Sequence, residues 1–384
     1  MKVLLVHNRY RHAGGEERHV DLLETSLTAH GISVERFERD STLLELSRAA
    51  RLRVAATLTY SRGAEHEFAR LLASSKPDVV HVHNIWPLLT PAVLRAASRS
   101  GSAVVMTMHN YRFACPAGTL LRGGEVHEDC IDGSSLHCGL RNARGRRGES
   151  LAYGIAIELQ RRLRLLERWV DRFVAPSEFL RRMMVRAGLP GDRISVVRPG
   201  VPVDGEQPPA AGGGFLYAGR LSPEKGVEVL LAAAQLAPEL PLAVAGSGPL
   251  EARLRAEAPP SLAVLGSLAR RELAVLQRRC LMAVQPSICY EVSPLATMEA
   301  LACGRGVIAS RIGGLPELVE DGVTGLLVEP GDPVALAEAM KTVWSEPETA
   351  RELGANGRRW AEQEFALGGQ TDRLVGVYED ALRG

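Results

Sequence analysis

The sequence predicts an α/β protein with two doubly wound, Rossmann-like domains that face a cleft. Short apolar runs of strand length alternate with stretches of helical spacing along the chain. This alternation is typical of parallel sheets with helices on both faces. It stops once, at the Pro- and Gly-rich residues 199–202 and 207–214, and then begins again. Because such clusters commonly separate domains, they indicate a boundary between two of them.

The first half contains the pattern of one such domain. Five apolar runs have the length of buried strands: residues 3–7, 79–83, 103–108, 173–175 and 195–197. Stretches of helical spacing lie between them, at residues 17–30, 91–99 and 178–187. We expect ligands at the carboxyl ends of these strands, where open parallel sheets bind them.

The second half repeats the pattern. Its predicted strands are residues 215–217, 242–245, 262–265, 282–285, 307–309 and 326–328. Residues 333–384 read as helix with no further strand. We therefore expect a first domain at 1–198, a second at 199–365, and a C-terminal helix at about 366–384 that packs back on the first.

Composition and charge narrow the class of protein. The chain has 384 residues, 46% of them hydrophobic, and a formal net charge of +1, which does not indicate a nucleic-acid partner. Six Cys are too few for a disulfide-built scaffold. No apolar stretch has the length of a secretory leader or of a membrane-spanning helix. These features predict a cytoplasmic location.

The loop after the predicted strand 215–217 has the residues of a phosphate site. Gly219 permits a tight turn and a close approach of backbone to a ligand. Arg220 and Lys225 follow it, just before a predicted helix at 227–237. Two cations beside a helix N-terminus suit a diphosphate. The alternative is a surface loop with two solvated charges.

A second segment, which follows strand 282–285, predicts another helix start. Ser293 is a good N-cap residue, and Pro294 suits the first helical position. The helix would then begin with free N–H groups at Leu295 and Ala296, which can receive a phosphate.

Two carboxylates accompany this helix. Glu291 precedes it, and Glu299 lies more than one turn inside it. A carboxylate can accept paired hydrogen bonds from neighbouring sugar hydroxyls. Two of them at different depths can hold two sugar rings, for instance a transferred hexose and a ribose. The alternative is a capped amphipathic helix with one exposed Glu.

Together the two segments resemble one family. The run Gly219-Arg220-Leu221-x-Pro223-x-Lys225-Gly226, followed by Glu291, Glu299 and then Ala300-Leu301-Ala302-Cys303-Gly304, is similar to the retaining glycosyltransferases of family 4, which have the GT-B fold. The resemblance covers nearly the whole chain. It implies that the first domain takes the acceptor and the second binds the nucleotide sugar.

The resemblance also implies residue roles. Arg220 and Lys225 would bind the donor diphosphate, Glu299 the ribose, and Glu291 the transferred sugar at the catalytic centre. Ser293 and Leu295 would belong to the donor site as the start of the phosphate-binding helix. The chain departs from the commonest pattern, which has Gly where this sequence has Pro294, so one backbone contact to the donor is missing or shifted.

The glycines after strand 3–7 form a second candidate site. Gly14 and Gly15 precede a helix, where backbone can approach a ligand closely, although a Gly pair is often only a turn. By the resemblance, Gly15 lies near the donor diphosphate, and Gly14 and Glu16 line the acceptor side. The sequence has no G-x-G-x-x-G, which argues against a nicotinamide enzyme.

Histidines follow two neighbouring strands of the first domain. His109 ends the run 103–108, and His81 and His83 end the run 79–83. A lone His is often structural, but these lie at the sheet edge where sites form. By the resemblance, His109 is catalytic and faces the transferred sugar. From its place at the end of the neighbouring strand, we expect His83 to line the acceptor pocket.

The loop at 113–140 is long for a compact domain, and we expect it to shape the acceptor site. It contains Cys115, Cys130 and Cys138, with His127 and His137. Thiolates and imidazoles are zinc ligands, but the loop has no C-x-x-C pair. Buried free thiols and a disulfide are the alternatives to a zinc site.

Residues 141–198 hold 14 Arg against six acidic residues. One predicted helix has an apolar stripe of Ile155, Leu159, Leu163, Leu166 and Val170. Four arginines lie largely off this stripe: Arg161, Arg162, Arg164 and Arg168. Such a helix usually packs on its own domain. The alternative is peripheral contact with anionic lipid at the inner membrane face, which suits a lipid-linked acceptor.

These features predict a retaining transfer of sugar from a nucleoside-diphosphate sugar to a glycan, lipid-linked or small-molecule acceptor. No Asp-x-Asp motif stands out as a metal clamp, so we expect neither a metal nor another cofactor. A sugar-nucleotide epimerase or hydrolase on the same scaffold is one alternative. A non-catalytic sugar-nucleotide-binding subunit is another. The base, the sugar, the acceptor and the oligomeric state are not predicted.

Overall fold

The computed structural model describes residues 1–10, 14–41, 54–203 and 212–384. Contacts divide the chain into two compact units. The first unit is Met1–Arg122, His127–Gly200 and Gln370–Gly384, and the second is Gly123–Val126 and Val201–Gly369. Part of the predicted boundary segment, residues 207–211, lies outside the described residues.

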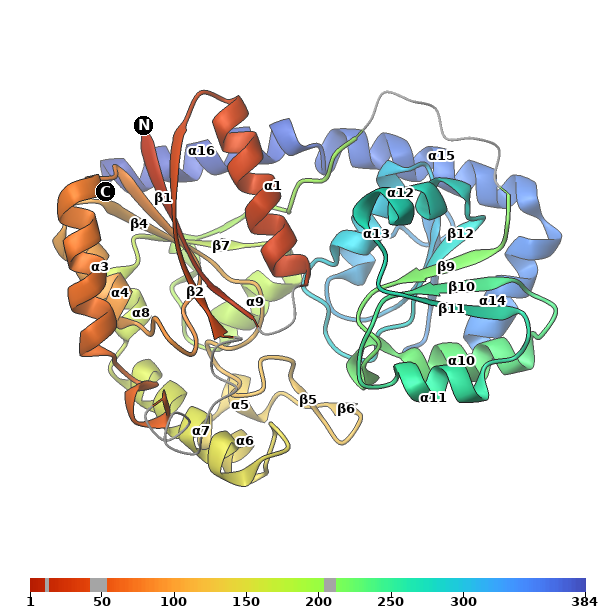
Figure 1. Ribbon diagram of the computed structural model, residues 1–384, viewed down its shortest axis with the longest axis horizontal. Coiled ribbons are helices and arrows are strands. Elements are labelled where there is room, and N and C mark those ends of the chain that lie inside the picture. Colours follow the sequence, from red (N-terminus) through yellow and green to blue (C-terminus); the bar gives the residue numbers. More distant parts are fainter. Residues whose placement is uncertain (11–13, 42–53, 204–211) are drawn as a thin grey trace. The chain divides into compact units, whose positions relative to one another are not determined.

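Among the described residues, the first unit has a six-stranded parallel sheet in the order β2-β1-β3-β4-β7-β8 (Figure 1). Its strands are β1 (Lys2–Arg9), β2 (Ser33–Asp40), β3 (Val79–Asn84), β4 (Ala103–Thr107), β7 (Arg172–Ala175) and β8 (Ile194–Val196). Its longer helices are α1 (Gly15–Ala29), α3 (Arg62–Ser75), α4 (Ala92–Arg99), α7 (Arg147–Arg162), α9 (Glu178–Arg186) and most of α16 (Leu367–Arg383).

Strand β2 is absent from the sequence prediction. Five of its eight residues, SVERFERD, are charged, and none of the eight is fully buried. It is an edge strand that pairs with β1 alone. A search for apolar runs finds buried strands and therefore overlooks an edge strand of this kind.

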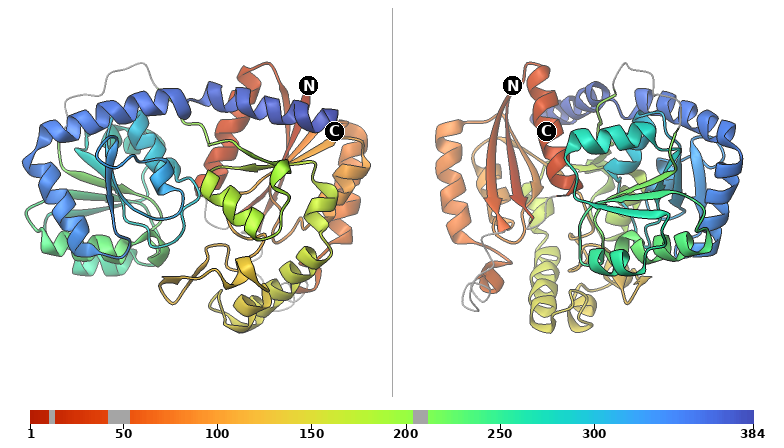
Figure 2. Two further views of the ribbon diagram at one scale, coloured as in Figure 1. Left: turned by 180° about the vertical axis from the view of Figure 1, so that it is seen from behind. Right: turned by 45° about the vertical axis from the view of Figure 1, so that its right-hand side comes forward.

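Helices cover both faces of the first sheet. On one face, apolar side chains of α1 and α16, among them Leu23 and Tyr378, pack on strand residues such as Leu5 and Val105. The right-hand view of Figure 2 shows the strands between α1 on one side and α3 on the other. The C-terminal helix therefore completes the core of the first unit.

The second unit has its own parallel sheet, six-stranded within the described residues, in the order β11-β10-β9-β12-β13-β14. Its strands are β9 (Phe215–Ala218), β10 (Leu242–Ala245), β11 (Leu262–Gly266), β12 (Met282–Gln285), β13 (Val307–Ser310) and β14 (Gly325–Val328). Its helices are α10 (Val227–Leu236), α11 (Glu251–Glu257), α12 (Arg270–Arg279), α13 (Leu295–Ala302), α14 (Pro333–Ser345) and α15 (Pro347–Glu364).

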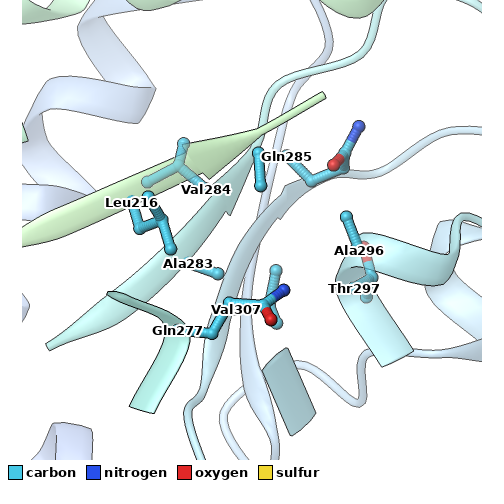
Figure 3. Close-up of a pocket in the computed structure, with 9 residues that line it drawn as sticks. Leu216, Gln277, Ala283, Val284, Gln285, Ala296, Thr297 and Val307 are labelled. Carbon is cyan, nitrogen blue, oxygen red and sulfur yellow. The ribbon is translucent and has the colours of Figure 1, made fainter. Parts of the chain in front are cut away.

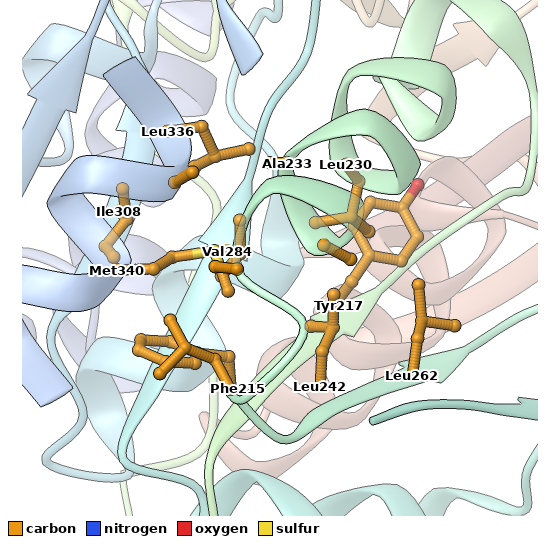
Figure 4. Close-up of a cluster of buried hydrophobic side chains, with 14 of the residues drawn as sticks. Phe215, Tyr217, Leu230, Ala233, Leu242, Leu262, Val284, Ile308, Leu336 and Met340 are labelled. Atoms are coloured by element: carbon orange, nitrogen blue, oxygen red, sulfur yellow. The ribbon is translucent and has the colours of Figure 1, made fainter. Parts of the chain in front are cut away.

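The core of the second unit lies between its sheet and the helices α10 and α14. Phe215, Tyr217 and Val284 of the sheet pack against Leu230 of α10 and Met340 of α14 (Figure 4). All five side chains are almost wholly buried. The predicted α/β class with two doubly wound sheets is confirmed.

Each sheet has a topological switch point, where consecutive connections leave in opposite directions along the sheet. In the first sheet it lies between β1 and β3, and in the second between β9 and β12. Ligands of open parallel sheets bind at the carboxyl ends of the strands beside such a point. The two switch points are therefore the places to search for a site.

The connection from β4 to α7 holds the short strands β5 (Leu121–Arg122) and β6 (Glu125–Val126) and the short helices α5 (Asp129–Asp132) and α6 (Leu136–Leu140). Within the described ranges, no helix combines the length and the apolar character needed to cross a membrane.

Candidate functional site

The switch point of the second unit begins with the loop after β9. Pro223–Lys225 forms a short 3-10 turn, and Gly226 then adopts φ +70°. A Cβ at Gly226 would lie 1.7 Å from the carbonyl oxygen of Pro286, so only glycine fits this position. The close approach brings Lys225 next to the loop that follows β12.

Lys225 meets Glu291 in this place. Its Nζ donates to Glu291 Oε1 at 2.6 Å, and the two residues are 66 positions apart in the chain. The Glu291 side chain is only 8% exposed. Burial disfavours the charged ammonium, but the neighbouring carboxylate of Glu291 outweighs burial and raises the pKa of Lys225. Lys225 is therefore a cation at neutral pH.

Two neutral groups complete the contacts of Glu291. Ser287 Oγ donates to Glu291 Oε1 at 2.6 Å, and Gln285 Nε2 lies 3.4 Å from the same oxygen. The backbone is held as well, because Gly314 N–H donates to the Glu291 carbonyl at 2.7 Å. Among the described residues, these side-chain contacts fall on Oε1, so Oε2 is the oxygen that can accept from a ligand.

Arg220 differs from Lys225 in its surroundings. Its side chain is 53% exposed and forms an ion pair with Glu224 at 2.8 Å. Its backbone carbonyl accepts from the hydroxyl of buried Tyr217 at 2.8 Å. Arg220 therefore has a fixed backbone, whereas its guanidinium lies in solvent.

The predicted cap of α13 is wrong by one residue. The N-cap is Pro294, in an extended conformation with ψ 119°, and its carbonyl accepts from Thr297 N–H at 3.2 Å. Ser293 Oγ instead contacts the sulfur of Met298 at 3.5 Å. Because the helix begins at Leu295, the N–H groups of Leu295 and Ala296 still belong to its first turn and have no acceptor within the helix. Ser293 therefore has no capping role.

Glu299 lies in the second turn of α13 and is half-buried. Behind the start of the same helix is a small pocket of about 10 Å³, lined by Gln285, Ala296 and Thr297 with apolar side chains of β9, β12 and β13 (Figure 3). This volume holds at most one water molecule. The pocket is therefore not the place of a nucleotide.

Histidines gather at the switch point of the first unit. His83 Nδ1 and His109 Nε2 share a hydrogen bond of 2.9 Å, and their rings stack with centroids 5.2 Å apart. The His19 ring, from α1, lies 5.2 Å from that of His109. His81 is bonded to Tyr378 and Thr107, each at 2.7 Å, which fixes its orientation.

Burial keeps these imidazoles neutral. It lowers the pKa of His19 to about 4 and that of His81 to about 3, with a further contribution from neighbouring histidines. The pKa values of His83 and His109 are lowered as well, for the same reason. The cluster therefore offers uncharged donors and acceptors near pH 7. Ring nitrogens of His19, His83 and His109 lie within 4.8 Å of one another, a spacing that can hold a metal ion.

The glycine turn is held by a residue that the sequence did not single out. Glu17 accepts from Gly14 N–H at 2.8 Å and from Tyr10 N–H at 2.9 Å. Burial opposes ionisation of Glu17, but these hydrogen bonds and the neighbouring His7 ring, 3.7 Å away, outweigh it and lower its pKa to about 2. The N–H of Gly14 is thus used within the protein, whereas Gly15 is exposed at the first position of α1.

Glu16 lies beside the histidine cluster, with Oε1 3.7 Å from His7 Nδ1. Burial and the charge of Glu17 raise the pKa of Glu16 well above the ordinary value.

The sequence contained a signal for Glu17, because a Glu three residues after a helix N-cap often accepts a hydrogen bond from the N–H of the cap residue. No sequence signal joins Ser287 to Glu291.

The arginine-rich helix differs from its prediction. Helix α7 ends at Arg162, and Leu166 and Val170 lie buried beyond it. Four leucine or isoleucine side chains are instead exposed in one row on α7 and its C-cap: Leu151 at 39%, Ile155 at 50%, Leu159 at 41% and Leu163 at 44%. Arg161 is not a solvated charge, because it donates to the carbonyls of Cys130, Gly133 and Ala187.

Among the three cysteines of the long loop, the structure pairs Cys130 with Cys138 in a disulfide. Cys115 remains a buried thiol beside them. His137 is exposed.

Comparison with known proteins gives two family matches. The model for glycosyl transferases group 1 matches residues 211–360, and that for glycosyltransferase family 4 matches residues 13–204. D-inositol 3-phosphate glycosyltransferase 1 of Catenulispora acidiphila is 30% identical over 345 residues, which are 82% of this chain and 75% of that protein.

A second relative, O-antigen chain mannosyltransferase C of Escherichia coli, is 33% identical over 174 residues. That alignment covers 44% of this chain and 47% of the mannosyltransferase, so it spans about half of each. Among solved structures, Anabaena HepE in complex with UDP-glucose matches with a TM-score of 0.65 and 19% identity, covering 99% of this chain and 100% of the other.

Proposed function

The chain belongs to the family 4 glycosyltransferases, and we propose on that basis that it moves a sugar from a nucleoside-diphosphate sugar to an acceptor with retention of configuration. Its two parallel-sheet units have the GT-B fold of that family. The observation that carries the proposal is the Lys225–Glu291 pair at the switch point of the second sheet.

The chemistry needs stabilisation of a leaving group. Transfer breaks the bond between the anomeric carbon and the diphosphate, and negative charge grows on the phosphate as it leaves. Lys225 is a partly buried cation at the switch point of the second sheet, and the first N–H groups of α13 add partial positive charge. In the proposal these groups, with Arg220, hold the diphosphate. Removing one donor of this kind costs about 3–4 kcal/mol of transition-state stabilisation.

The carboxylates suit the sugar rings. Oε1 of Glu291 is occupied by Lys225 and Ser287, so Oε2 is left to accept from a hydroxyl of the transferred sugar. Glu299, one helical turn or more away on α13, suits the ribose. The binding of UDP-glucose by HepE, the GT-B neighbour, supports a nucleotide-sugar donor.

The neutral histidine cluster of the first unit suits the hydroxyl groups of the acceptor and of the transferred sugar, which carry no charge. His109 would face the transferred sugar, with the pKa of its imidazole lowered by burial and by neighbouring histidines and its ring bonded to His83. Gly15, exposed at the start of α1, suits the approach of the diphosphate. Gly14, Glu16 and His83 would line the acceptor side. The acceptor is proposed as a glycan, a lipid-linked molecule or a small molecule.

The proposal requires no metal or other cofactor, because the cations that compensate the diphosphate come from Arg220 and Lys225. The test is turnover after dialysis against a chelator, with and without added magnesium. Full activity in chelator supports the proposal. Loss of activity that magnesium restores would overturn it and would direct attention to His19, His83 and His109.

A peripheral membrane contact at the cytoplasmic face is the proposed location. The exposed row Leu151, Ile155, Leu159 and Leu163 is flanked by arginines in contact with solvent, among them Arg146, Arg147, Arg162 and Arg164. Apolar side chains beside cations suit a surface of anionic lipid. Flotation with phosphatidylglycerol vesicles tests this. Ile155→Asp should abolish flotation. The matched change Val275→Asp, at an exposed position of α12, should leave flotation intact.

The reaction itself is tested by incubating the protein with a panel of nucleoside-diphosphate sugars, with and without acceptors, and analysing products by mass spectrometry. A new glycoside whose anomeric configuration equals that of the donor supports the proposal. Conversion of the donor alone, to an epimer or a free sugar, would indicate an epimerase or hydrolase. Nucleotide binding without turnover in any mixture would indicate a non-catalytic subunit.

A further inference from the structure

The loop between β4 and α7 brings three sulfurs and an imidazole to one place. The Sγ atoms of Cys115, Cys130 and Cys138 all lie within 4.8 Å of one another, and all three residues are buried. The ring nitrogens of His127 lie 3.9 and 4.0 Å from Cys138 Sγ. All four residues belong to the first unit.

The disulfide uses only two of these groups. Cys130 and Cys138 form it, whereas the Cys115 thiol lies within 4.8 Å of both sulfurs and the His127 ring lies beside Cys138 Sγ alone. An isolated disulfide needs neither a third thiol nor an imidazole beside it. The convergence of four ligand atoms is therefore the feature to be explained.

Hydrogen bonds outside the cluster hold the segments that carry it. Ser135 Oγ donates to the carbonyl of Ala114 at 2.7 Å, which ties the Cys115 segment to the start of α6. Arg161 of α7 donates to the carbonyl of Cys130 at 2.8 Å. Glu158 accepts from Ser135 N–H at 2.9 Å. The positions of the sulfurs are thus set by contacts that do not depend on the disulfide.

The four groups are a known ligand set for zinc. Three thiolates and one imidazole make a closed tetrahedral structural site, with Zn–S near 2.3 Å and Zn–N near 2.0–2.1 Å. Those bond lengths place sulfurs roughly 3.8 Å apart in a tetrahedron, within the spacing found here. His127 and Cys130 are separated by two residues, the separation of the paired ligands in many zinc sites.

We propose that the reduced chain binds one Zn²⁺ through Cys115, His127, Cys130 and Cys138. The disulfide and the metal site are alternative states of the same cysteine pair. A dithiol reductant converts the Cys130–Cys138 bond into two thiols with two electrons and two protons, and is itself oxidised to a disulfide. The three thiols then release their protons as zinc binds.

The consequence concerns the shape of the loop. The loop begins directly after β4, the strand that His109 follows, and ends at α7. A zinc ion would join Cys115, early in the loop, to Cys138 in α6 and to the His127–Cys130 segment between them. The metal would thus fix the loop by coordination, away from the reacting atoms. This proposal does not depend on the transferase activity.

The first test is zinc content. Protein produced with zinc and purified with a dithiol reductant is analysed by plasma mass spectrometry, and its free thiols are counted. One zinc per chain is expected. Cys115→Ser and His127→Ala should reduce zinc to background, and His127→Cys should retain it as a four-thiolate site. Cys280→Ser removes a buried thiol of the second unit and should change nothing.

Cobalt(II) provides a spectroscopic test of the ligands. Cobalt in place of zinc should give intense thiolate charge-transfer and tetrahedral d–d bands, which Cys115→Ser weakens and His127→Cys shifts. Circular dichroism identifies variants that fail to fold. If Cys115→Ser or His127→Ala does not fold, the cobalt spectrum of the folded His127→Cys protein still tests the ligand set. A folded, fully reduced protein without metal after incubation with zinc would overturn the proposal. Zinc retained in folded Cys115→Ser would also overturn it.

Discussion

The side chains at the two switch points of this molecule differ in charge. In the second unit, the Lys225 ammonium forms an ion pair with the Glu291 carboxylate at 2.6 Å. In the first unit, His19 and His83 are buried, His109 is half-buried, and desolvation lowers the pKa of all three, which keeps them neutral near pH 7. The same topology, a parallel sheet with a switch point, thus supports one site suited to a phosphate and another suited to uncharged hydroxyl groups. Under the proposed function, the donor site and the acceptor site therefore differ in the charge of their side chains.

The first prediction tests whether the Lys225 cation at the second switch point contributes to turnover. Lys225→Met should lower turnover by about 10²–10³, because it removes a partly buried cation that the proposed function places beside the leaving group. Arg220→Met should have a smaller effect, since Arg220 is half exposed and screened by solvent. Steady-state kinetics on the wild type and the variants measures both.

Lys341→Met is the matched control for Lys225→Met. Lys341 is a lysine of α14 with a 37% exposed side chain that also pairs with a glutamate, Glu338. Its replacement should leave turnover unchanged. Wild-type turnover in Lys225→Met would show that the second unit does not stabilise the leaving group through this lysine.

The second prediction concerns the neutral site. Because the folded-state pKa of His19 is about 4, below the unfolded value near 6.5, acid protonates the unfolded chain first. Stability is therefore full above about pH 7 and falls as pH falls from there towards 4. The loss between pH 7.5 and 5 is about 2 kcal/mol for each such histidine.

Urea unfolding at pH 7.5 and 5 measures this loss. His19→Leu should make the stability less dependent on pH, whereas His66→Gln, at an exposed position of α3, should not. An equal pH dependence in wild type and His19→Leu would contradict the neutral state assigned to this histidine.

The third prediction sharpens the role of backbone geometry at the charged site. Gly226→Ala should destabilise the second unit by more than about 2 kcal/mol and reduce turnover, because a Cβ there collides with the carbonyl of Pro286. Gly331→Ala is the control, since Gly331 has a similar φ of +80° with open space around its Cβ position. Its cost should be about 1–2 kcal/mol, with unchanged turnover. Thermal unfolding that ranks the two variants equally would exclude the proposed collision.

The smallest expected effect is at the ribose carboxylate. Glu299→Ala should weaken nucleoside-diphosphate binding about tenfold, the value of one or two hydrogen bonds to a charged group. Calorimetry measures the affinity, with Glu317→Ala as a control at a second half-buried glutamate of the same unit. If Glu299→Ala binds as tightly as wild type, the ribose assignment is wrong.

Much of the fold could be predicted because its buried strands are apolar runs. Strand β2 could not, since its charged residues at the sheet edge have no such pattern. Lys225 and Glu291 could both be selected from local sequence, but their contact, across 66 residues, depends on how Gly226 packs under Pro286. The sequence analysis placed Ser293 at the N-cap of α13, but Pro294 occupies that position. The proline ring is compatible with both the N-cap and the first helical position, so the sequence alone does not distinguish them.

The central claim is that the cations of the second unit hold the pyrophosphate of an activated sugar. The most direct measurement is a crystal structure of this protein soaked with nucleoside-diphosphate sugars. The account predicts phosphate oxygens within hydrogen-bond distance of Lys225 Nζ and near the N–H groups of Leu295 and Ala296. Phosphates bound far from Lys225 and Arg220 would contradict it.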